Sequence, residues 1–187
     1  MKFQFSLPGR FAGSASSARG LAFVGLSALL TVGFAAPTKL TNLPLSLDPG
    51  AKLFVMSDAY LLKKFPTGSR PDLLFKTSDD KVSIAFEWRG TKLTPADVNT
   101  MLTQFPAVIM AQVPGIKTLN KQMLKLNGND WADFVFVAPN KTGDVRRELL
   151  ITSAQGRMLI VTVSSNLADY GKNEADVKAL TGSITLN

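Results

Sequence analysis

The sequence predicts an α+β fold, in which helices pack on an antiparallel β-sheet. Residues 82–89 alternate between apolar and polar side chains, as expected for a strand with one buried face. Residues 127–128 are an Asn-Gly pair between two apolar runs, which is a strong hairpin signal. Residues 94–97 read Thr-Pro-Ala-Asp and precede apolar residues at helical spacing. Together these patterns predict strands joined by tight turns and interrupted by helices.

The first part of this fold is predicted to be irregular. Residues 36–51 contain three prolines among leucines and are expected to form an extended lead-in that packs onto the core. Residues 53–57 are a short apolar run and are predicted as the first strand. Residues 60–65 either continue that strand or form an irregular segment. The turn-forming residues 66–71 predict a loop.

A hairpin and a helix are expected next. Residues 73–77 and 81–89 are predicted to pair through a short polar turn. Thr94 can cap a helix, and Pro95 suits its first position because its missing N–H is not needed there. Pro106 is expected to kink or end this helix, since proline removes one backbone hydrogen bond from a helix interior.

The C-terminal half is predicted to consist mainly of strands. Residues 119–127 and 130–138 would pair through the Asn-Gly turn, and residues 144–152 would pair with residues 157–164. The last of these strands is largely apolar on both faces. It is therefore predicted to be a central strand that is covered on both sides.

A second helix is predicted over residues 173–181. Asn166 is a candidate N-terminal cap before it, and Gly182 is expected to stop it. Residues 183–186 would then form a final edge strand.

The first 36 residues have the layout of a secretory signal peptide. Three basic residues and no acidic residue precede the uncharged apolar stretch 20–36. Gly33 and Ala35 supply the small side chains that a signal peptidase needs, so residues 1–35 are predicted to be a signal peptide. The alternatives are an uncleaved anchor and an organelle transit peptide. With a signal peptide or an anchor the remaining chain would lie in the periplasm. Membrane contact is expected only through an uncleaved leader.

Composition limits the functions that remain for the predicted single domain, residues 52–187. The chain has 21 basic and 14 acidic residues, but three of the basic ones lie in the leader. Basic residues are at most paired in the sequence, so binding of nucleic acid is not expected. The chain has no Cys and no His, which excludes disulfides, Ser-His-Asp and Cys-His catalysis, and makes a zinc site unlikely to form. No cofactor, no metal and no catalytic residue is predicted.

Three residues are candidates for contact with a partner protein: Asp130, Trp131 and Arg146. Trp131 follows a polar turn at the start of a strand, where a partly exposed ring would suit a contact surface. Burial in the core is the alternative for this ring. Asp130 and Asp133 flank Trp131, but two carboxylates are too few for a metal site. The pair Asp79-Asp80 is interpreted as a solvated turn rather than a calcium site.

Arg147 alternates with Glu148 along the same predicted strand and shares its face with apolar residues. An arginine in that position either has an acidic partner or marks an exposed edge strand. The edge position is the simpler interpretation.

The order of elements resembles the Mog1/PsbP-like fold. The segments that carry the resemblance are Leu126–Trp131, Arg147–Thr152 and Arg157–Val163, which resemble the second half of that fold. The resemblance covers residues 52–186. It implies an α/β sandwich in a superfamily of binding and accessory domains. No functional residue is carried over, since no motif matches position by position.

Two functions from different classes follow from these observations. The first is a non-catalytic, exported protein-binding domain of the accessory or toxin-immunity type. The second is a carrier of a small apolar ligand or lipid in the cell envelope, which would use a pocket between the sheet and the apolar helix 98–111. An enzyme that uses carboxylates or a Ser-Lys pair ranks behind both, because the chain lacks imidazole and thiolate groups.

Overall fold

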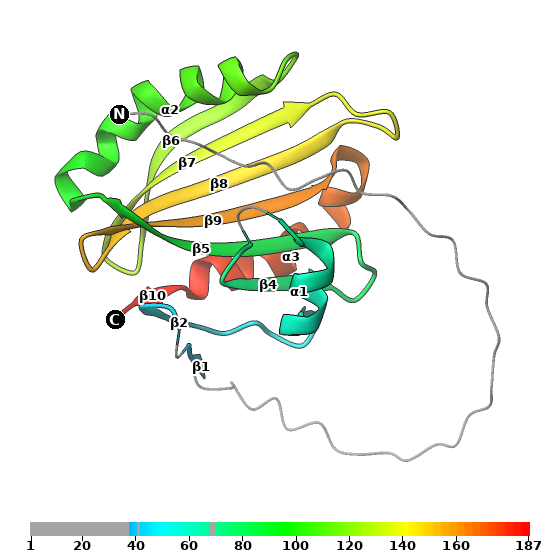
Figure 1. Cartoon of the computed structure of the whole chain (residues 1–187), viewed down its shortest axis with the longest axis horizontal. Coiled ribbons are helices and arrows are strands. Elements are labelled where there is room, and N and C mark those ends of the chain that lie inside the picture. Colours follow the sequence, from blue (N-terminus) through cyan, green and yellow to red (C-terminus); the bar gives the residue numbers. More distant parts are fainter. Residues whose placement is uncertain (1–37, 41, 68–69) are drawn as a thin grey trace.

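The computed structural model describes residues 38–40, 42–67 and 70–187, and the predicted leader lies outside the described residues. These residues form two antiparallel sheets and three α-helices (Figure 1). The large sheet has the order β3 (Leu53–Val55), β4 (Leu73–Thr77), β5 (Val82–Lys92), β9 (Arg157–Asn166), β8 (Val145–Ala154), β7 (Asn129–Ala138) and β6 (Lys117–Leu126). The small sheet has the order β1 (Thr38–Lys39), β2 (Leu45–Leu47) and β10 (Thr185–Leu186). The helices are α1 (Asp58–Lys64), α2 (Val98–Gln112) and α3 (Leu167–Ser183).

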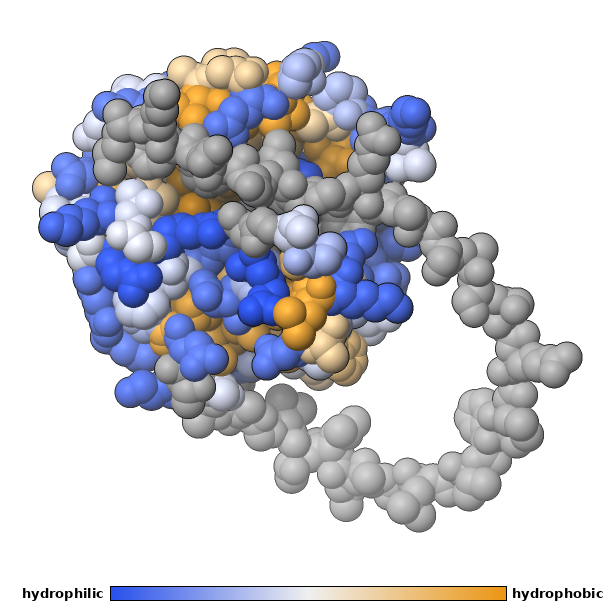
Figure 2. Space-filling model, in the orientation of Figure 1, coloured by the Kyte–Doolittle hydropathy of each residue, from blue (hydrophilic) through white to orange (hydrophobic). Residues whose placement is uncertain are grey.

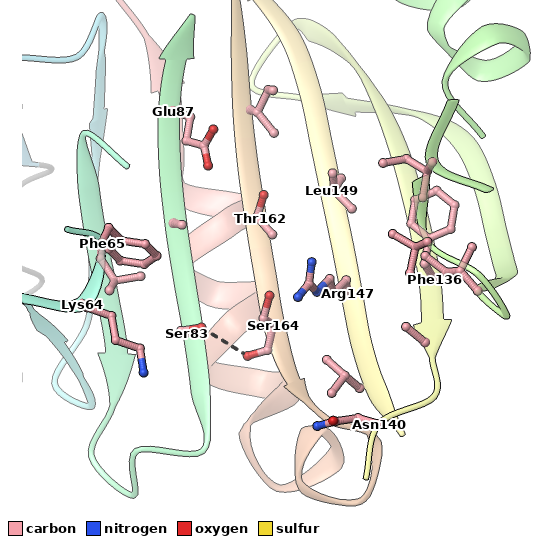
Figure 3. Close-up of a pocket in the computed structure, with 18 of the residues that line it drawn as sticks. Lys64, Phe65, Ser83, Glu87, Phe136, Asn140, Arg147, Leu149, Thr162 and Ser164 are labelled. Carbon is pink, nitrogen blue, oxygen red and sulfur yellow. Dashed lines mark hydrogen bonds between the residues drawn. The ribbon is translucent and has the colours of Figure 1, made fainter. Parts of the chain in front are cut away.

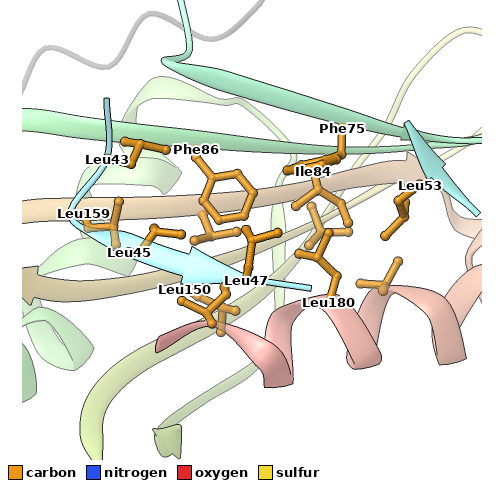
Figure 4. Packing of buried hydrophobic residues seen from close by; sticks show 14 of the residues in the cluster. Leu43, Leu45, Leu47, Leu53, Phe75, Ile84, Phe86, Leu150, Leu159 and Leu180 are labelled. Atoms are coloured by element: carbon orange, nitrogen blue, oxygen red, sulfur yellow. The ribbon is translucent and has the colours of Figure 1, made fainter. Parts of the chain in front are cut away.

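One face of the large sheet is covered by α3 and the small sheet (Figure 4). Leu45 and Leu47 of β2 are almost fully buried between the sheet and α3, so part of the predicted lead-in belongs to the core. Burial of each leucine side chain stabilises the fold by about 1.5–3 kcal/mol. The C-terminal β10 pairs with β2, which joins the two ends of the described chain.

The opposite face carries a second core beneath α2. Phe105 of α2 lies with its ring centroid 5.2 Å from that of Phe134, which in turn stacks on Phe136 of the same strand at 6.0 Å. These rings are buried together with Ile109 and Ile151. The cluster holds α2 mainly over β7 and β6, at one edge of the sheet.

Much of the predicted secondary structure is confirmed. The strands over residues 73–77 and 81–89 pair as β4 and β5, and β9 is central between β5 and β8. The Asn127-Gly128 turn joins β6 to β7 with both residues at positive φ, 46° and 83°. A capping box forms between Thr94 and Asp97 in the short 3₁₀ turn before α2.

Three predictions need correction. Residues 60–65 are neither strand nor irregular, since they lie mostly in α1, whose first turn is capped by Ser57. Pro106 was predicted to kink or end its helix. It does not end the helix, because α2 continues to Gln112. Burial of Phe105 and Ile109 on either side of the proline offsets the single hydrogen bond that it removes. The last helix is also longer than predicted and runs through Gly182.

Candidate functional site

The described helices cover only part of the second face of the sheet, and a pocket forms beside them. On this face α2 lies mainly over β6 and β7, whereas α1 lies near β4 at the other end of the strand order. Between the two helices, no helix of the described residues covers β5, β9 and β8, whose side chains line the pocket (Figure 3). The resulting pocket has a volume of about 400 Å³. This volume is within the range of about 300–1,000 Å³ that is typical of sites for small ligands.

The floor of the pocket is built from the side chains that alternate away from the α3 face. In β5 the residues Val82, Ile84 and Phe86 are buried against α3, so Ser83 and Ala85 point to the pocket. The ladder places Ser83 opposite Ser164 of β9. Small and hydroxyl-bearing side chains leave space on this floor that larger residues would fill.

The walls of the pocket are mostly apolar. The C-terminal part of α2 contributes Ile109, the residue after the helix contributes Val113, and β7 contributes Phe136. Phe65, which follows α1, closes the opposite side. The pocket therefore offers a ligand an apolar surface on two sides and a polar floor between them.

Arg147 lies in the middle of the floor. It is opposite Ser164 of β9 on one side and opposite Phe136 of β7 on the other, so β8 is an interior strand. The prediction that Arg147 marks an edge strand is wrong. Its Nε is buried and has no hydrogen-bond partner, and among the described residues no acidic side chain forms an ion pair with it. Burial lowers the pKa of the guanidinium from its ordinary value, but arginine stays charged.

The other charged side chains of the pocket whose contacts are described are paired. Glu87 forms an ion pair with Arg89. Burial raises the pKa of Glu87, and the neighbouring Arg89 only partly offsets this effect. Lys76 pairs with Asp80 and lies 5.2 Å from the ring centroid of Tyr60. Arg147 differs from these groups, since its buried Nε has no hydrogen-bond partner and none of the described acidic side chains pairs with it.

The structure does not bring the three predicted contact residues together. Trp131 is fully buried in the α3-side core and offers no surface to a partner in this conformation. Asp130 is exposed and lies 3.5 Å from Lys125. Arg146 points to the α3 side, where it pairs with Glu148 at 2.7 Å, and its guanidinium carbon lies 3.6 Å from the ring centroid of Tyr170. A contact of these residues with a partner stays a prediction.

The acidic residues considered as metal ligands have other roles. The Asp79 carboxylate accepts hydrogen bonds from the hydroxyl of Thr77 at 2.6 Å and from the side-chain amide of Asn173 at 3.1 Å. It therefore connects the β4–β5 turn to α3. Asp130 and Asp133 lie three residues apart on one strand and so point to opposite faces. Within the described ranges, no group of three or more acidic residues could hold a metal ion.

The sequence interpretation singled out none of the pocket-floor residues as a site. The available signal was the polar face of β5 and β9. Ser83 lies on that face of β5, and Thr162 and Ser164 lie two residues apart on that face of β9. Polar residues in that pattern are usually solvated, so they point to a site only once the neighbouring helices are known to form walls.

The fold and the pocket together define a small α/β sandwich domain with a ligand-sized cavity on the open side of its sheet. The predicted Mog1/PsbP-like fold is confirmed by comparison with solved structures. The chain is similar to cyanobacterial PsbP (CyanoP) of Synechocystis sp. PCC 6803, with a TM-score of 0.59 and 10% identity over 87% of this chain and 99% of that one. It is also similar to LpqN, a protein involved in cell envelope biogenesis of Mycobacterium tuberculosis, with a TM-score of 0.52 and 13% identity over 84% and 87% of the two chains.

Comparison with protein-family models and with curated protein sequences finds no match. The similarity is therefore one of fold, at 10–13% identity in the two structures above. Within the part of the chain that the structure describes, no helix is long and apolar enough to cross a membrane.

Proposed function

We propose that this chain is a non-catalytic binding domain of the cell envelope that holds a small amphipathic molecule in the pocket between α1, α2 and the sheet. The observation that carries this proposal is the 400 Å³ pocket with apolar walls on a sheet face that is otherwise covered by helices. A non-catalytic role is supported by the absence of His and Cys from the sequence. The predicted signal peptide and the envelope role stated for LpqN support the location.

Binding of a neutral apolar dye tests this proposal. N-phenyl-naphthylamine fluoresces more strongly in apolar surroundings, so titration of the folded protein should give a saturable rise in emission. Ala85→Phe adds a ring on the pocket floor and is expected to weaken dye binding by at least about tenfold, since the added side chain occupies the ligand's space.

Ala179→Phe is the matched control, because Ala179 is exposed on α3 at the other side of the sheet. It adds the same ring and should leave the affinity for the dye unchanged. Equal dye binding by the wild type and Ala85→Phe, with both proteins folded, would count against the pocket as the binding site.

A protein-binding role is the second candidate, and one observation favours it. The edge strand β3 and the adjacent α1 expose the large apolar residues Phe54, Val55 and Leu62, each at more than half of its full surface. Apolar side chains also reach the surface over α1 on the face seen in Figure 2. An exposed apolar group beside an unpaired strand edge is a suitable docking surface for a partner protein.

Site-specific photo-crosslinking tests this second candidate. A photoreactive residue at position 62 should give one defined crosslinked product in intact cells, whereas the same residue at position 179 on α3 should give none. The accessory type of partner fits this surface. The toxin-immunity type stays a prediction, because no observed feature favours it over other partners.

A further inference from the structure

From the floor of the pocket we infer the chemistry of its ligand: an oxyanion head group, a carboxylate or a phosphate ester, that pairs with the Arg147 guanidinium and carries an apolar tail. This inference rests on the proposed function, since it names the class of molecule that the same pocket binds.

The first argument is the unsatisfied guanidinium. Arg147 has a buried Nε without an acceptor, and no described acidic side chain pairs with it. Buried polar groups in native proteins are nearly always hydrogen-bonded, so an unpaired one needs an explanation. Glu87 and Lys76, which also line the pocket, have partners within the protein. An anionic ligand would supply the acceptor that the protein does not provide.

The second argument is the set of hydroxyl groups around this charge. Figure 3 shows the Arg147 guanidinium directed toward the strand that carries Thr162 and Ser164. The ladder places Ser164 directly opposite Arg147. No described hydrogen bond uses either of these hydroxyls as a donor. Their O–H groups can therefore donate to the same oxyanion that accepts from the guanidinium.

The third argument is the apolar surface beside the charge. Leu149 follows Arg147 on the same face of β8, and Phe136 lies opposite Arg147 on β7. Ile109 of α2 and Val113, which follows that helix, continue this surface. An inorganic anion alone would leave these side chains uncovered, whereas the tail of an amphipath would bury them.

Glu87 lies far from Arg147 along the floor of the pocket. It lies opposite Ile160, whereas Arg147 lies opposite Ser164, which is four residues further along β9. This separation corresponds to about 13 Å along the strand. At that end the charges of Glu87 and Arg89 offset each other in an ion pair, so the anionic head of the ligand is expected at Arg147.

Calorimetric titration with three ten-carbon probes tests the inference: decanoate and decyl phosphate, each below its micelle concentration, and the neutral decanol below its solubility limit. We expect the wild type to bind at least one of the two anions about 10- to 100-fold more tightly than decanol, as a charge-assisted hydrogen bond predicts. The anion that binds more tightly identifies the head group as carboxylate or phosphate.

Two variants assign the preference to Arg147. Arg147→Met should remove the preference for the anions while leaving decanol binding in place, and Arg147→Lys should keep only part of it because the fork geometry is lost. Lys178→Met is the charge-matched control, since Lys178 is an exposed residue of α3 on the other side of the sheet. It should keep the full preference.

The outcomes separate this inference from the function on which it rests. If decanol binds the wild type as tightly as both anions, or if Arg147→Met keeps the preference, the head-group inference is overturned and the apolar pocket stands. If none of the three probes binds the folded wild type, the proposed function fails and the inference fails with it.

Discussion

Replacing Arg147 with methionine should increase the free energy of unfolding of the ligand-free protein. The substitution removes a partly buried charge that has no counterion among the described residues, and it puts an apolar side chain of similar length beside Leu149 and Phe136. Leaving a buried donor without an acceptor costs about 1–3 kcal/mol. Since Arg147 faces a pocket that admits water, we take the lower end, about 1 kcal/mol. For a domain of this size that raises Tm by about 2–4 °C.

Replacing the neighbouring Arg146 with methionine should instead lower the free energy of unfolding. Arg146 is paired with Glu148 at 2.7 Å and covers the Tyr170 ring. Arg146→Met leaves the Glu148 carboxylate without its partner in a mostly buried place. Breaking such a pair costs about 3–5 kcal/mol when it is fully buried, and about 3 kcal/mol is expected here because both side chains keep some exposure.

Urea denaturation followed by circular dichroism measures both effects. The protein must first be stripped of any co-purified ligand, because a bound ligand would stabilise the wild type and hide the gain in Arg147→Met. A loss of 1 kcal/mol or more in ligand-free Arg147→Met would refute the reasoning. It would mean that the guanidinium makes favourable interactions within the protein.

Three further predictions concern residues outside the pocket. Burial raises the pKa of Asp133 despite the hydrogen bond from Gln122. The stability that the protonated Asp133 contributes is therefore fully present below the unfolded-state pKa and is lost as pH rises through the folded-state pKa. Asp133→Asn should therefore gain about 1 kcal/mol at neutral pH and little near pH ~4, and equal gains at the two pH values in urea denaturation would contradict this. Hydrogen bonding from Thr77 holds the pKa of Asp79 below its ordinary value. Asp79→Ala should therefore lower the free energy of unfolding by about 1–2 kcal/mol at neutral pH, and by less as pH falls through the folded-state pKa. A loss of stability that does not depend on pH would show another cause. Asn127 donates to two backbone carbonyls at the end of α3, at 3.1 Å and 2.8 Å. Asn127→Ala should therefore lower the free energy of unfolding by about 1–2 kcal/mol and speed amide exchange in the last turn of α3. Unchanged exchange in that turn would argue against this link.

The sequence was sufficient for most of the sheet because its strands are patterned locally. The alternation over residues 82–89 and the Asn127-Gly128 turn each depend on a few neighbouring residues, and both are observed as predicted. The helix α1 was missed because its seven residues, Asp58–Lys64, are too few to show a clear apolar period. Its start at Ser57, which accepts a hydrogen bond from the backbone of Tyr60, is a capping signal that a sequence can show.

The site could not be predicted from the sequence to the same extent. Arg147 among apolar neighbours was noticed, but its position in an interior strand depends on the pairing of β8 with both β7 and β9. Whether Ser83 and Thr162 face solvent or a pocket depends on where α1 and α2 lie over the sheet. These are contacts between residues far apart in the chain, and local patterns do not encode them.

The pairing of β2 with β10 has a consequence for when the fold can be completed. Ser46 pairs with Thr185, so the small sheet closes only when nearly the whole chain is available. Until then Leu45 and Leu47 have no complete site against the large sheet and α3. Contacts between such distant segments form late, since a long loop must be closed first. A chain that crosses a membrane as an extended polymer would thus be kept from completing its fold until its last strand has followed.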